Sequence, residues 1–271
     1  MVHSIIPVFN GYFTVLFEDE TKKHAPKVEN IPSFFFVIKS GNDDIVVVDT
    51  GFSRDYIPGV GSFCNRTPEQ EVEPMMLSRG FDPLKVRYVI ITHMHWDHTG
   101  AMKIFKNAEF IIQRYEFLQM MNLNPNEETY YNPAHWIDLL PRVQVVNGNM
   151  EFLPGISLIQ TGGHTHGHQA VRVTTPAGAV MLVGDSPFNY DMLWKMFPEE
   201  YWDKFKNGPG KRFYWDNSTI SVLKDYVDRL GGPMKYTPQT MTYADLRRLA
   251  DTVVFSHDPK LVSVNSIPSH C

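Results

Sequence analysis

The chain has 271 residues, of which 43% are hydrophobic and 20% are charged, proportions typical of a globular protein rather than a disordered, collagen-like or coiled-coil one. Its formal net charge of -5, from 25 Lys and Arg against 30 Asp and Glu, gives no electrostatic reason to bind nucleic acid. The two cysteines, Cys64 and Cys271, are too few for a disulfide framework or a thiolate metal cage, which favours the reducing cytoplasm.

The beginning of the chain predicts a protein that stays in the cytoplasm. Residues 1–10 show no basic leader followed by a long apolar stretch, and no run in the chain reaches the ~20 apolar residues that cross a bilayer. We therefore expect neither export nor a membrane partner. The length permits two domains, but no Pro- or Gly-rich linker separates two complete patterns, so a single domain over residues 1–271 is predicted.

Short strands are the commonest predicted elements. Residues 34–40 and 45–51 are apolar runs joined by a polar turn, which predicts a β-hairpin. Residues 86–91 form a β-branched apolar run typical of a buried strand, and it stops at Thr92 and a group of histidines. Further strands are predicted at residues 109–113, 157–161, 170–174, 180–184 and 252–255. Most of these strands end next to a His or an Asp.

Helical patterns are clearest at residues 219–230 and 243–249, the second preceded by Thr242 with Asp245 three residues on, as in a capping box. Strands mixed with helices predict a layered α/β fold. Residues 189–218 are predicted to be an insertion rich in aromatic side chains. Its composition fits a helical excursion packed on the core as well as it fits a lid over a substrate.

Three imidazoles and a carboxylate lie within six residues directly after the strand at 86–91, namely His93, His95, Asp97 and His98. Imidazole nitrogen and carboxylate oxygen are ligands that zinc and similar divalent ions accept. The alternating spacing lets His93 and His95 point one way, while Asp97 and His98 face a second ion. The isolated histidines receive no role: His3, His24, His135 and His270.

The pattern His93-x-His95-x-Asp97-His98 resembles the signature of the metallo-β-lactamase superfamily. Other segments match further motifs of that superfamily, in the same order along nearly the whole chain: Val48-Asp49-Thr50-Gly51, Gly163-His164-Thr165, Gly184-Asp185 and Ser256-His257-Asp258. The resemblance implies a four-layer αββα sandwich of the α/β class. It also implies that the protein is a metal-dependent hydrolase.

The same resemblance implies a site for two divalent metal ions. One ion would be bound by His93, His95 and His164 and the other by Asp97, His98 and His257, with Asp185 bridging the two. Asp97 and Asp185 would be the catalytic carboxylates, whereas Asp49 and His168 would support the ligands without binding an ion. Zinc is the expected metal, and iron, manganese and cobalt are the alternatives that such a site accepts.

Within the superfamily, residues 110–114 and 163–169 resemble the N-acyl homoserine lactonases and related lactone hydrolases. This resemblance implies that a hydroxide bridging the ions opens a lactone ring and that Asp97 passes a proton to the leaving group. Hydrolysis of another ester, a thioester or an amide at the same site is the first alternative. A diiron redox protein is the remote one, since relatives of that kind have a carboxylate in place of His95 and carry a flavin-binding domain.

The substrate pocket is less well defined by the motifs. Residues 163–168 offer three imidazoles, of which the family pattern selects His164, and His166 is either a pocket residue or exposed to solvent. Lactonases of this group often have a tyrosine three residues after the bridging aspartate, where this chain has Phe188. Either Tyr190 replaces that hydroxyl or the metal ion alone polarises the carbonyl. We therefore expect a small, mostly apolar carbonyl substrate that differs from acyl homoserine lactones.

Overall fold

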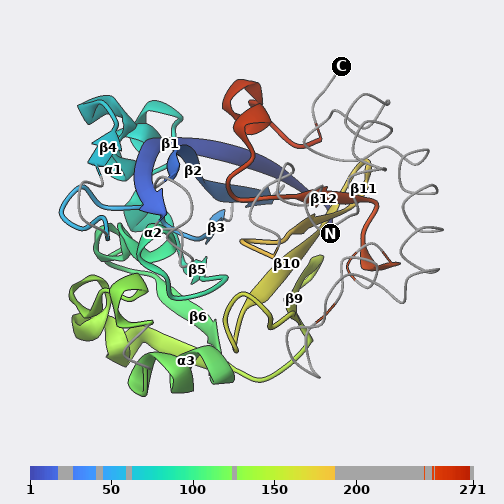
Figure 1. Ribbon diagram of the computed structural model, residues 1–271. Coiled ribbons are helices and arrows are strands. Elements are labelled where there is room, and N and C mark those ends of the chain that lie inside the picture. The colour runs from blue at the N-terminus through green and yellow to red at the C-terminus, as the bar shows by residue number, and fades with distance from the viewer. Residues whose placement is uncertain are drawn as a thin grey trace, which may run out of the picture.

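In the computed structural model, the described residues are 1–17, 27–40, 45–58, 63–123, 127–186, 241, 246 and 248–268. Two β-sheets in this part of the chain pack against each other with a hydrophobic core between them (Figure 1). The N-terminal half forms a seven-stranded sheet and the C-terminal half forms a five-stranded sheet. The predicted insertion at 189–218 and the predicted helix at 219–230 lie outside the described residues.

The seven-stranded sheet has the strand order β4-β1-β2-β3-β5-β6-β7. Its strands are β1 (His3–Phe17), β2 (Lys27–Ser40), β3 (Ile45–Val48), β4 (Phe63–Asn65), β5 (Tyr88–Ile90), β6 (Glu109–Gln113) and β7 (Val143–Val146). The antiparallel pairing of β2 with β3, with Phe36 opposite Val48, confirms the predicted hairpin. The strands predicted at 86–91 and 109–113 are also confirmed, as β5 and β6.

The long strand β1 is the main element of this sheet that the sequence patterns did not predict. It pairs with β2 from His3 to Phe17, but the register shifts between Phe9 and Tyr12. Gly11, at this irregularity, has a φ of 94°, a conformation that favours glycine. The bulge breaks the two-residue alternation by which a strand is recognised in a sequence.

The five-stranded sheet has the order β12-β11-β10-β9-β8. Its strands are β8 (Met150–Leu153), β9 (Ile156–Gln160), β10 (Gln169–Thr175), β11 (Gly178–Leu182) and β12 (Thr252–Val254). Four of these strands match the predicted ones to within a few residues. The hairpin partner β8 was missed, because its half-exposed and exposed residues carry little apolar pattern.

Short helices connect the strands. The α-helices that lie wholly within the described ranges are α1 (Val72–Ser78), α2 (Trp96–Thr99) and α3 (Arg114–Met121). The 3-10 helices of these ranges are η1 (Pro68–Gln70), η2 (Pro83–Lys85), η3 (Met102–Ile104), η4 (Glu128–Tyr130), η5 (Pro133–His135), η6 (Ile137–Arg142) and η8 (Pro259–Ser263). Of the predicted helix at 243–249, the described residues Leu246, Arg248 and Leu249 are helical.

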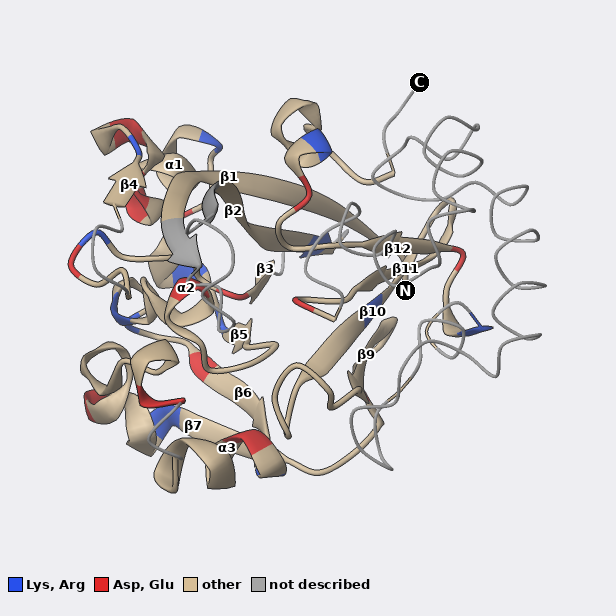
Figure 2. Ribbon diagram, in the orientation of Figure 1, with Lys and Arg blue, Asp and Glu red and all other residues tan. Residues whose placement is uncertain are grey.

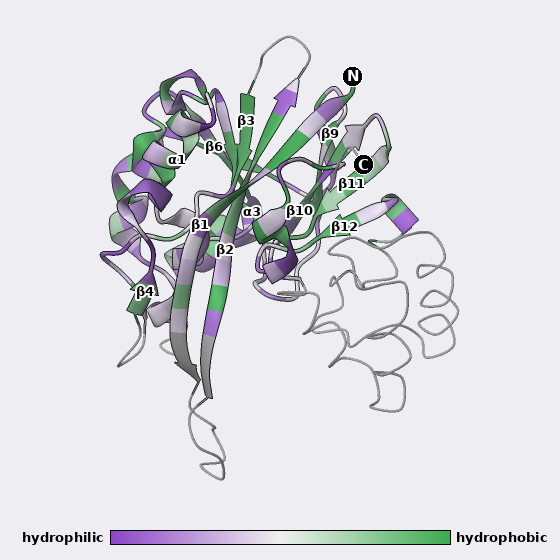
Figure 3. Cartoon of the chain, turned by 90° about the horizontal axis from the view of Figure 1, so that it is seen from above, coloured by the Kyte–Doolittle hydropathy of each residue, from purple (hydrophilic) through white to green (hydrophobic). Residues whose placement is uncertain are grey.

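The alternation of side chains along the strands builds two cores. Phe34 and Phe36 of β2 point into the core between the sheets, where they join residues such as Val171 and Leu182 of the other sheet. The neighbouring Phe35 points to the opposite face, which the helices and their connections cover. Figure 3 shows the apolar residues concentrated along the central strands. Three layers, one helical and two of sheet, are therefore built by the described residues.

The outer surface of the described part carries mixed charge. Lys and Arg residues and Asp and Glu residues are both scattered over the helices and loops (Figure 2). The expectation that nucleic acid is not a partner stays a prediction. Of the helices in the described ranges, none is both long enough and apolar enough to cross a lipid bilayer.

Parallel pairing brings the motif residues to one edge of the two sheets. β3 pairs parallel with β5, and β11 pairs parallel with β12. The residues that follow β3 and β5 are Asp49 and the histidine loop, and those that follow β11 and β12 are Asp185 and His257. Because the carboxyl ends of parallel strands meet at the same edge, polar side chains from segments far apart in the sequence converge there.

Candidate metal centre

Two groups of metal-ligating side chains meet at this edge. The first is His93, His95 and His164, and the second is Asp97, His98, Asp185 and His257. Within each group, one donor atom of every residue lies within 4.8 Å of the donor atoms of the others. The structure thus brings together all seven residues that the family resemblance implied as ligands. Sets of this composition and size can each hold one divalent ion.

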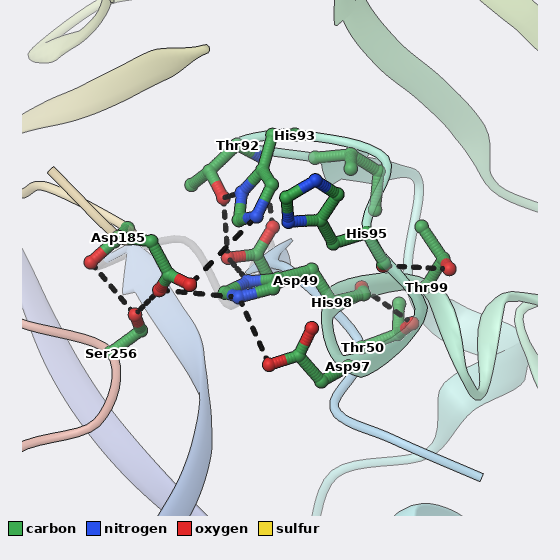
Figure 4. A network of polar contacts seen from close by, with 12 residues as sticks. Asp49, Thr50, Thr92, His93, His95, Asp97, His98, Thr99, Asp185 and Ser256 are labelled. Carbon is green, nitrogen blue, oxygen red and sulfur yellow. Dashed lines mark hydrogen bonds and ion pairs between the residues drawn. The ribbon is translucent and has the colours of Figure 1, made fainter. Parts of the chain in front are cut away.

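Asp49 orients His98. Its backbone has a φ of 60°, which is uncommon for a residue other than glycine. Its carboxylate accepts hydrogen bonds from the Thr92 amide (2.7 Å), the Thr92 hydroxyl (2.9 Å) and His98 Nδ1 (2.8 Å), as Figure 4 shows in part. Because Nδ1 donates to Asp49, the nitrogen that His98 turns toward the second group is Nε2.

Two other imidazoles are oriented in the same way, by a hydrogen bond from Nδ1 to an oxygen of the fold. The Thr92 hydroxyl donates to Asp49, so His93 Nδ1, 3.1 Å away, donates to the Thr92 oxygen. His257 Nδ1 donates to the Pro32 carbonyl at 2.8 Å. The Nε2 atoms of His93 and His98 are buried without a hydrogen-bond partner among the described residues. Such atoms are costly to bury, and a bound cation would satisfy both, so these residues fit a metal ion.

Asp185 faces both groups, one with each carboxylate oxygen. Oδ1 lies 3.3 Å from His98 Nε2 and 3.2 Å from His257 Nε2. Oδ2 lies 3.9 Å from His93 Nε2 and 3.6 Å from His164 Nε2. The carboxylate is therefore placed between the two sets of imidazoles, with a separate oxygen for each set.

Charges in the second group stabilise one another. Burial by itself raises the pKa of Asp185, but the facing His257 and His98 overcome it and hold that pKa well below its usual range. Conversely, burial lowers the pKa of His257, and Asp185 with Asp97 reverses the effect and raises it to about 9. Protonated imidazoles thus balance the two carboxylates in the chain without ions. A divalent cation would take over that role, with release of protons.

The first group differs in charge and in exposure. Burial and the neighbouring imidazoles lower the pKa of His93 and His95, that of His95 to about 3, so both rings are neutral. His93 is fully buried, His95 is half-buried and His164 is exposed, whereas all four members of the second group are buried. Solvent therefore reaches the centre from the side of His95 and His164.

The structure separates the three imidazoles of residues 163–168. His164 joins the first group, with Nε2 3.0 Å from His95 Nδ1. His168 is buried, its Nε2 accepts from the Asp185 amide (3.2 Å) and its Nδ1 donates to Thr161 Oγ1 (2.5 Å), so both of its nitrogens are engaged in supporting the loop. His166 is exposed beside Gln119 of α3, away from both groups. Phe188 and Tyr190 lie outside the described residues.

The isolated histidines that the structure describes form hydrogen bonds within the fold. His3 contacts Ser40 Oγ (2.8 Å) and the Pro154 carbonyl (2.9 Å). His135 Nδ1 lies 3.1 Å from Thr99 Oγ1, whose hydroxyl donates to the His95 carbonyl at 3.0 Å. His135 thus supports, through Thr99, the turn that carries His95, and sequence reasoning missed this contact between residues 36 positions apart. His24 and His270 are outside the described residues.

Three more supporting residues were missed. Thr92 links Asp49 to His93, and the Ser256 hydroxyl hydrogen-bonds Asp185 Oδ1. Both stand directly before a predicted ligand, a position that is a usable signal in the sequence. Glu116 is a buried carboxylate of α3. In the sequence it is the acidic residue of a short segment, Arg114–Met121, that also holds Arg114 and Gln119, and nothing in this pattern indicates that Glu116 is buried.

Replacing Asp49 with asparagine is expected to weaken binding of the second ion about 10- to 100-fold. Asparagine tolerates the positive φ of Asp49, so the backbone is preserved. The new amide group can no longer accept from both Thr92 and His98, and His98 then loses the contact that directs its Nε2 to the ion. Competition with a chromophoric chelator measures the change. Asp55→Asn, at an exposed position nearby, is the matched control, and equal affinities in the two variants would contradict the orienting role.

The comparison with protein families is unambiguous. The model of the metallo-beta-lactamase superfamily matches residues 29–257. The chain therefore belongs to the metallo-beta-lactamase superfamily, as its motifs predicted. The matched range begins in β2 and ends at His257, and thus includes all seven candidate ligands.

Among curated proteins, the similar ones are N-acyl homoserine lactonases. One from Bacillus thuringiensis is 27% identical over 175 residues, which make up 60% of this chain and 66% of that protein. The lactonase AttM of Rhizobium radiobacter is 31% identical over 187 residues, or 66% of this chain and 61% of that protein. The chain spans just under two thirds of the length of these relatives.

Solved structures agree on the fold. A crystal structure of a B. thuringiensis AiiA variant with N-decanoyl-L-homoserine bound at its active site has a TM-score of 0.67 at 21% identity, covering 100% of both chains. AidC, a dizinc quorum-quenching lactonase in complex with a product, has a TM-score of 0.61 at 15% identity, covering 97% of this chain and 89% of its own. These likenesses confirm the predicted metallo-β-lactamase fold.

Proposed function

We propose that the protein is a dinuclear metal-dependent hydrolase that opens a lactone ring. His93, His95 and His164 hold the first ion, and Asp97, His98 and His257 hold the second, with Asp185 bridging them. The observation that carries the proposal is the placement of Asp185, whose two oxygens lie 3.2–3.3 Å from imidazoles of one set and 3.6–3.9 Å from imidazoles of the other. Zinc is the proposed metal, since the donors are imidazole nitrogen and carboxylate oxygen and AidC is a dizinc protein.

Two bound divalent ions would lower the pKa of a water, polarise the carbonyl and stabilise the departing alkoxide. The chain itself supplies Asp97 as a proton carrier. In the chain without ions, the neighbouring His98 and His257 outweigh the effect of burial and hold the pKa of Asp97 below its usual value, so its carboxylate is ionised. Its Oδ2 lies 3.3 Å from His257 Nε2, at the wall of the centre where a leaving group would need that proton.

The lactone assignment rests on the N-acyl homoserine lactonases among the relatives. The chain departs from that group at Phe188, where a tyrosine is common, so the substrate we propose is a lactone with a different ring or acyl group. Phe188 and Tyr190 are the proposed pocket residues, and either the Tyr190 hydroxyl or the metal ion alone takes the place of the missing donor. Hydrolysis of another ester, a thioester or an amide remains the alternative that uses the same ions.

A panel of lactones, esters, thioesters and amides tests the substrate class through kcat/KM, measured with the zinc-loaded protein. We expect the highest values for a lactone and weaker activity on acyl homoserine lactones. If long-chain acyl homoserine lactones proved the best substrates by a wide margin, the conclusion from Phe188, that the substrate differs from them, would be wrong. Reaction of thioesters or amides alone would refute the lactonase proposal and leave only the metal-dependent hydrolase.

A further inference from the structure

Glu116 is a buried carboxylate in the first turn of α3, and the chemistry described above does not use it. Only 1% of its surface is exposed. Burial raises the pKa of its carboxyl group to about 7, although four hydrogen bonds from Thr165, Met94, Gly167 and Tyr131 favour the ionised form. The fold therefore keeps a carboxylate where burial opposes its charge, and this points to a specific use of its oxygens.

The two oxygens of Glu116 bind two different loops. Oε1 accepts a hydrogen bond from the Met94 amide at 2.7 Å, and Met94 stands between the candidate ligands His93 and His95. Oε2 accepts from the Thr165 hydroxyl at 2.5 Å, and Thr165 directly follows His164. A single carboxylate thus connects the loop that follows β5 in one sheet with the loop between β9 and β10 in the other.

The second loop is also fitted closely to α3. A side chain at Gly167 would place its Cβ 1.8 Å from the Glu116 amide nitrogen, so only glycine allows this approach. Gln119, one turn further along α3, accepts a hydrogen bond from the His166 amide at 2.8 Å. The peptide segment on either side of Thr165 therefore contacts α3 at several residues, and its position depends on that helix.

We propose that Glu116 is a positioning residue that holds His93, His95 and His164 in the geometry needed by the first metal ion. This inference rests on the metal centre of the proposed function. The three histidines come from two loops of different sheets, and His164 is exposed. Without a shared anchor, the loops could move apart and the three donor nitrogens would no longer converge.

The second group has anchors of its own. His98 is held by Asp49, His257 by the Pro32 carbonyl and Asp185 by Ser256. None of these contacts involves Glu116. Loss of the Glu116 carboxylate should therefore weaken the first ion and spare the second, whereas a residue with a general structural role would affect both ions alike.

Variants that lack one ligand separate the effect on the first ion from the effect on the second. His257→Ala leaves the first group as the stronger metal site, and His164→Ala leaves the second group as the stronger site. Glu116→Gln is introduced into each, and the affinity for Zn²⁺ alone is measured by chelator competition at mildly alkaline pH. We expect affinity to fall about 10- to 100-fold in the His257→Ala background and less than about 3-fold in the His164→Ala background. Glu109→Gln, an exposed glutamate at the start of β6, is the matched control.

Equal losses in both backgrounds, or no loss in the His257→Ala background, would overturn the proposal. Thr165→Val provides a second variant of nearly unchanged shape that removes only the hydroxyl bound to Glu116. It should show the same selectivity for the first ion with a smaller loss, and a loss at the second ion would count against the proposal. The readout is metal affinity, so a wrong substrate assignment would leave these results unchanged.

Discussion

Replacing Asp185 with alanine is expected to reduce bound metal from two ions per chain to at most one, and to lower turnover about a thousandfold or more. Each Asp185 oxygen faces a different group of imidazoles, so the substitution removes a ligand from both ions. It also removes an anion from between two dications. With five imidazoles and two carboxylates as ligands, Asp97 is left as the sole negative charge, and mutual repulsion of the ions then opposes double occupancy.

Elemental analysis of protein purified without added metal salts, before and after saturation with zinc, measures the stoichiometry. Asp138→Ala is the control, because Asp138 is an exposed partner of Lys103 and such surface pairs contribute little. A saturated content of one ion per chain in the unmodified protein, unchanged in Asp185→Ala, would falsify the dinuclear centre.

Asp97→Asn is expected to retain much of the bound metal and to lose about 10²- to 10⁴-fold in turnover, the range typical of a lost general acid or base. The amide oxygen of asparagine can still contact an ion, but the amide cannot accept and return a proton. Asp97 is buried beside His98 and His257, so the proposed proton carrier would stand at the ions themselves.

Metal content and kcat must be determined on the same preparation of Asp97→Asn. Asp55→Asn serves again as the exposed control. A leaving group of low pKa needs no proton, so the deficit should shrink for activated esters compared with unactivated ones. Near-normal turnover with both ions retained would show that Asp97 is a ligand and nothing more.

Much of the chemistry was readable from the sequence because its signals are local. Three imidazoles and a carboxylate within six residues, His93 to His98, follow an apolar run and predict a metal site at a strand end. The hairpin of β2 and β3 and the strands β5, β6 and β9 to β12 were predicted from short apolar runs. The long strand β1 was missed because a bulge interrupts its alternation.

Contacts between distant segments were not readable in this way. The hydrogen bond between His98 Nδ1 and Asp49 Oδ2, 2.8 Å long, joins residues 49 positions apart. It depends on the parallel pairing of β3 with β5. Similarly, the family pattern selected His164 as the ligand, but the physical reason that His168 is not a ligand appears only in the fold, where both of its nitrogens are engaged by Thr161 and the Asp185 amide.

The sequence by itself determined which residue types could bind metal and the family whose motifs they match, since ligand chemistry is a property of the side chains and the motif spacing is local. Tertiary structure alone decided that His95 and His164 of the first group reach solvent while the second group is buried, and that Glu116 lies between the loops of His93 and His164. Each of these is a matter of which chain segments meet and how far water is excluded between them. The hydrogen bonds between segments of the two sheets depend on these contacts, and local spacing in the sequence does not predict them.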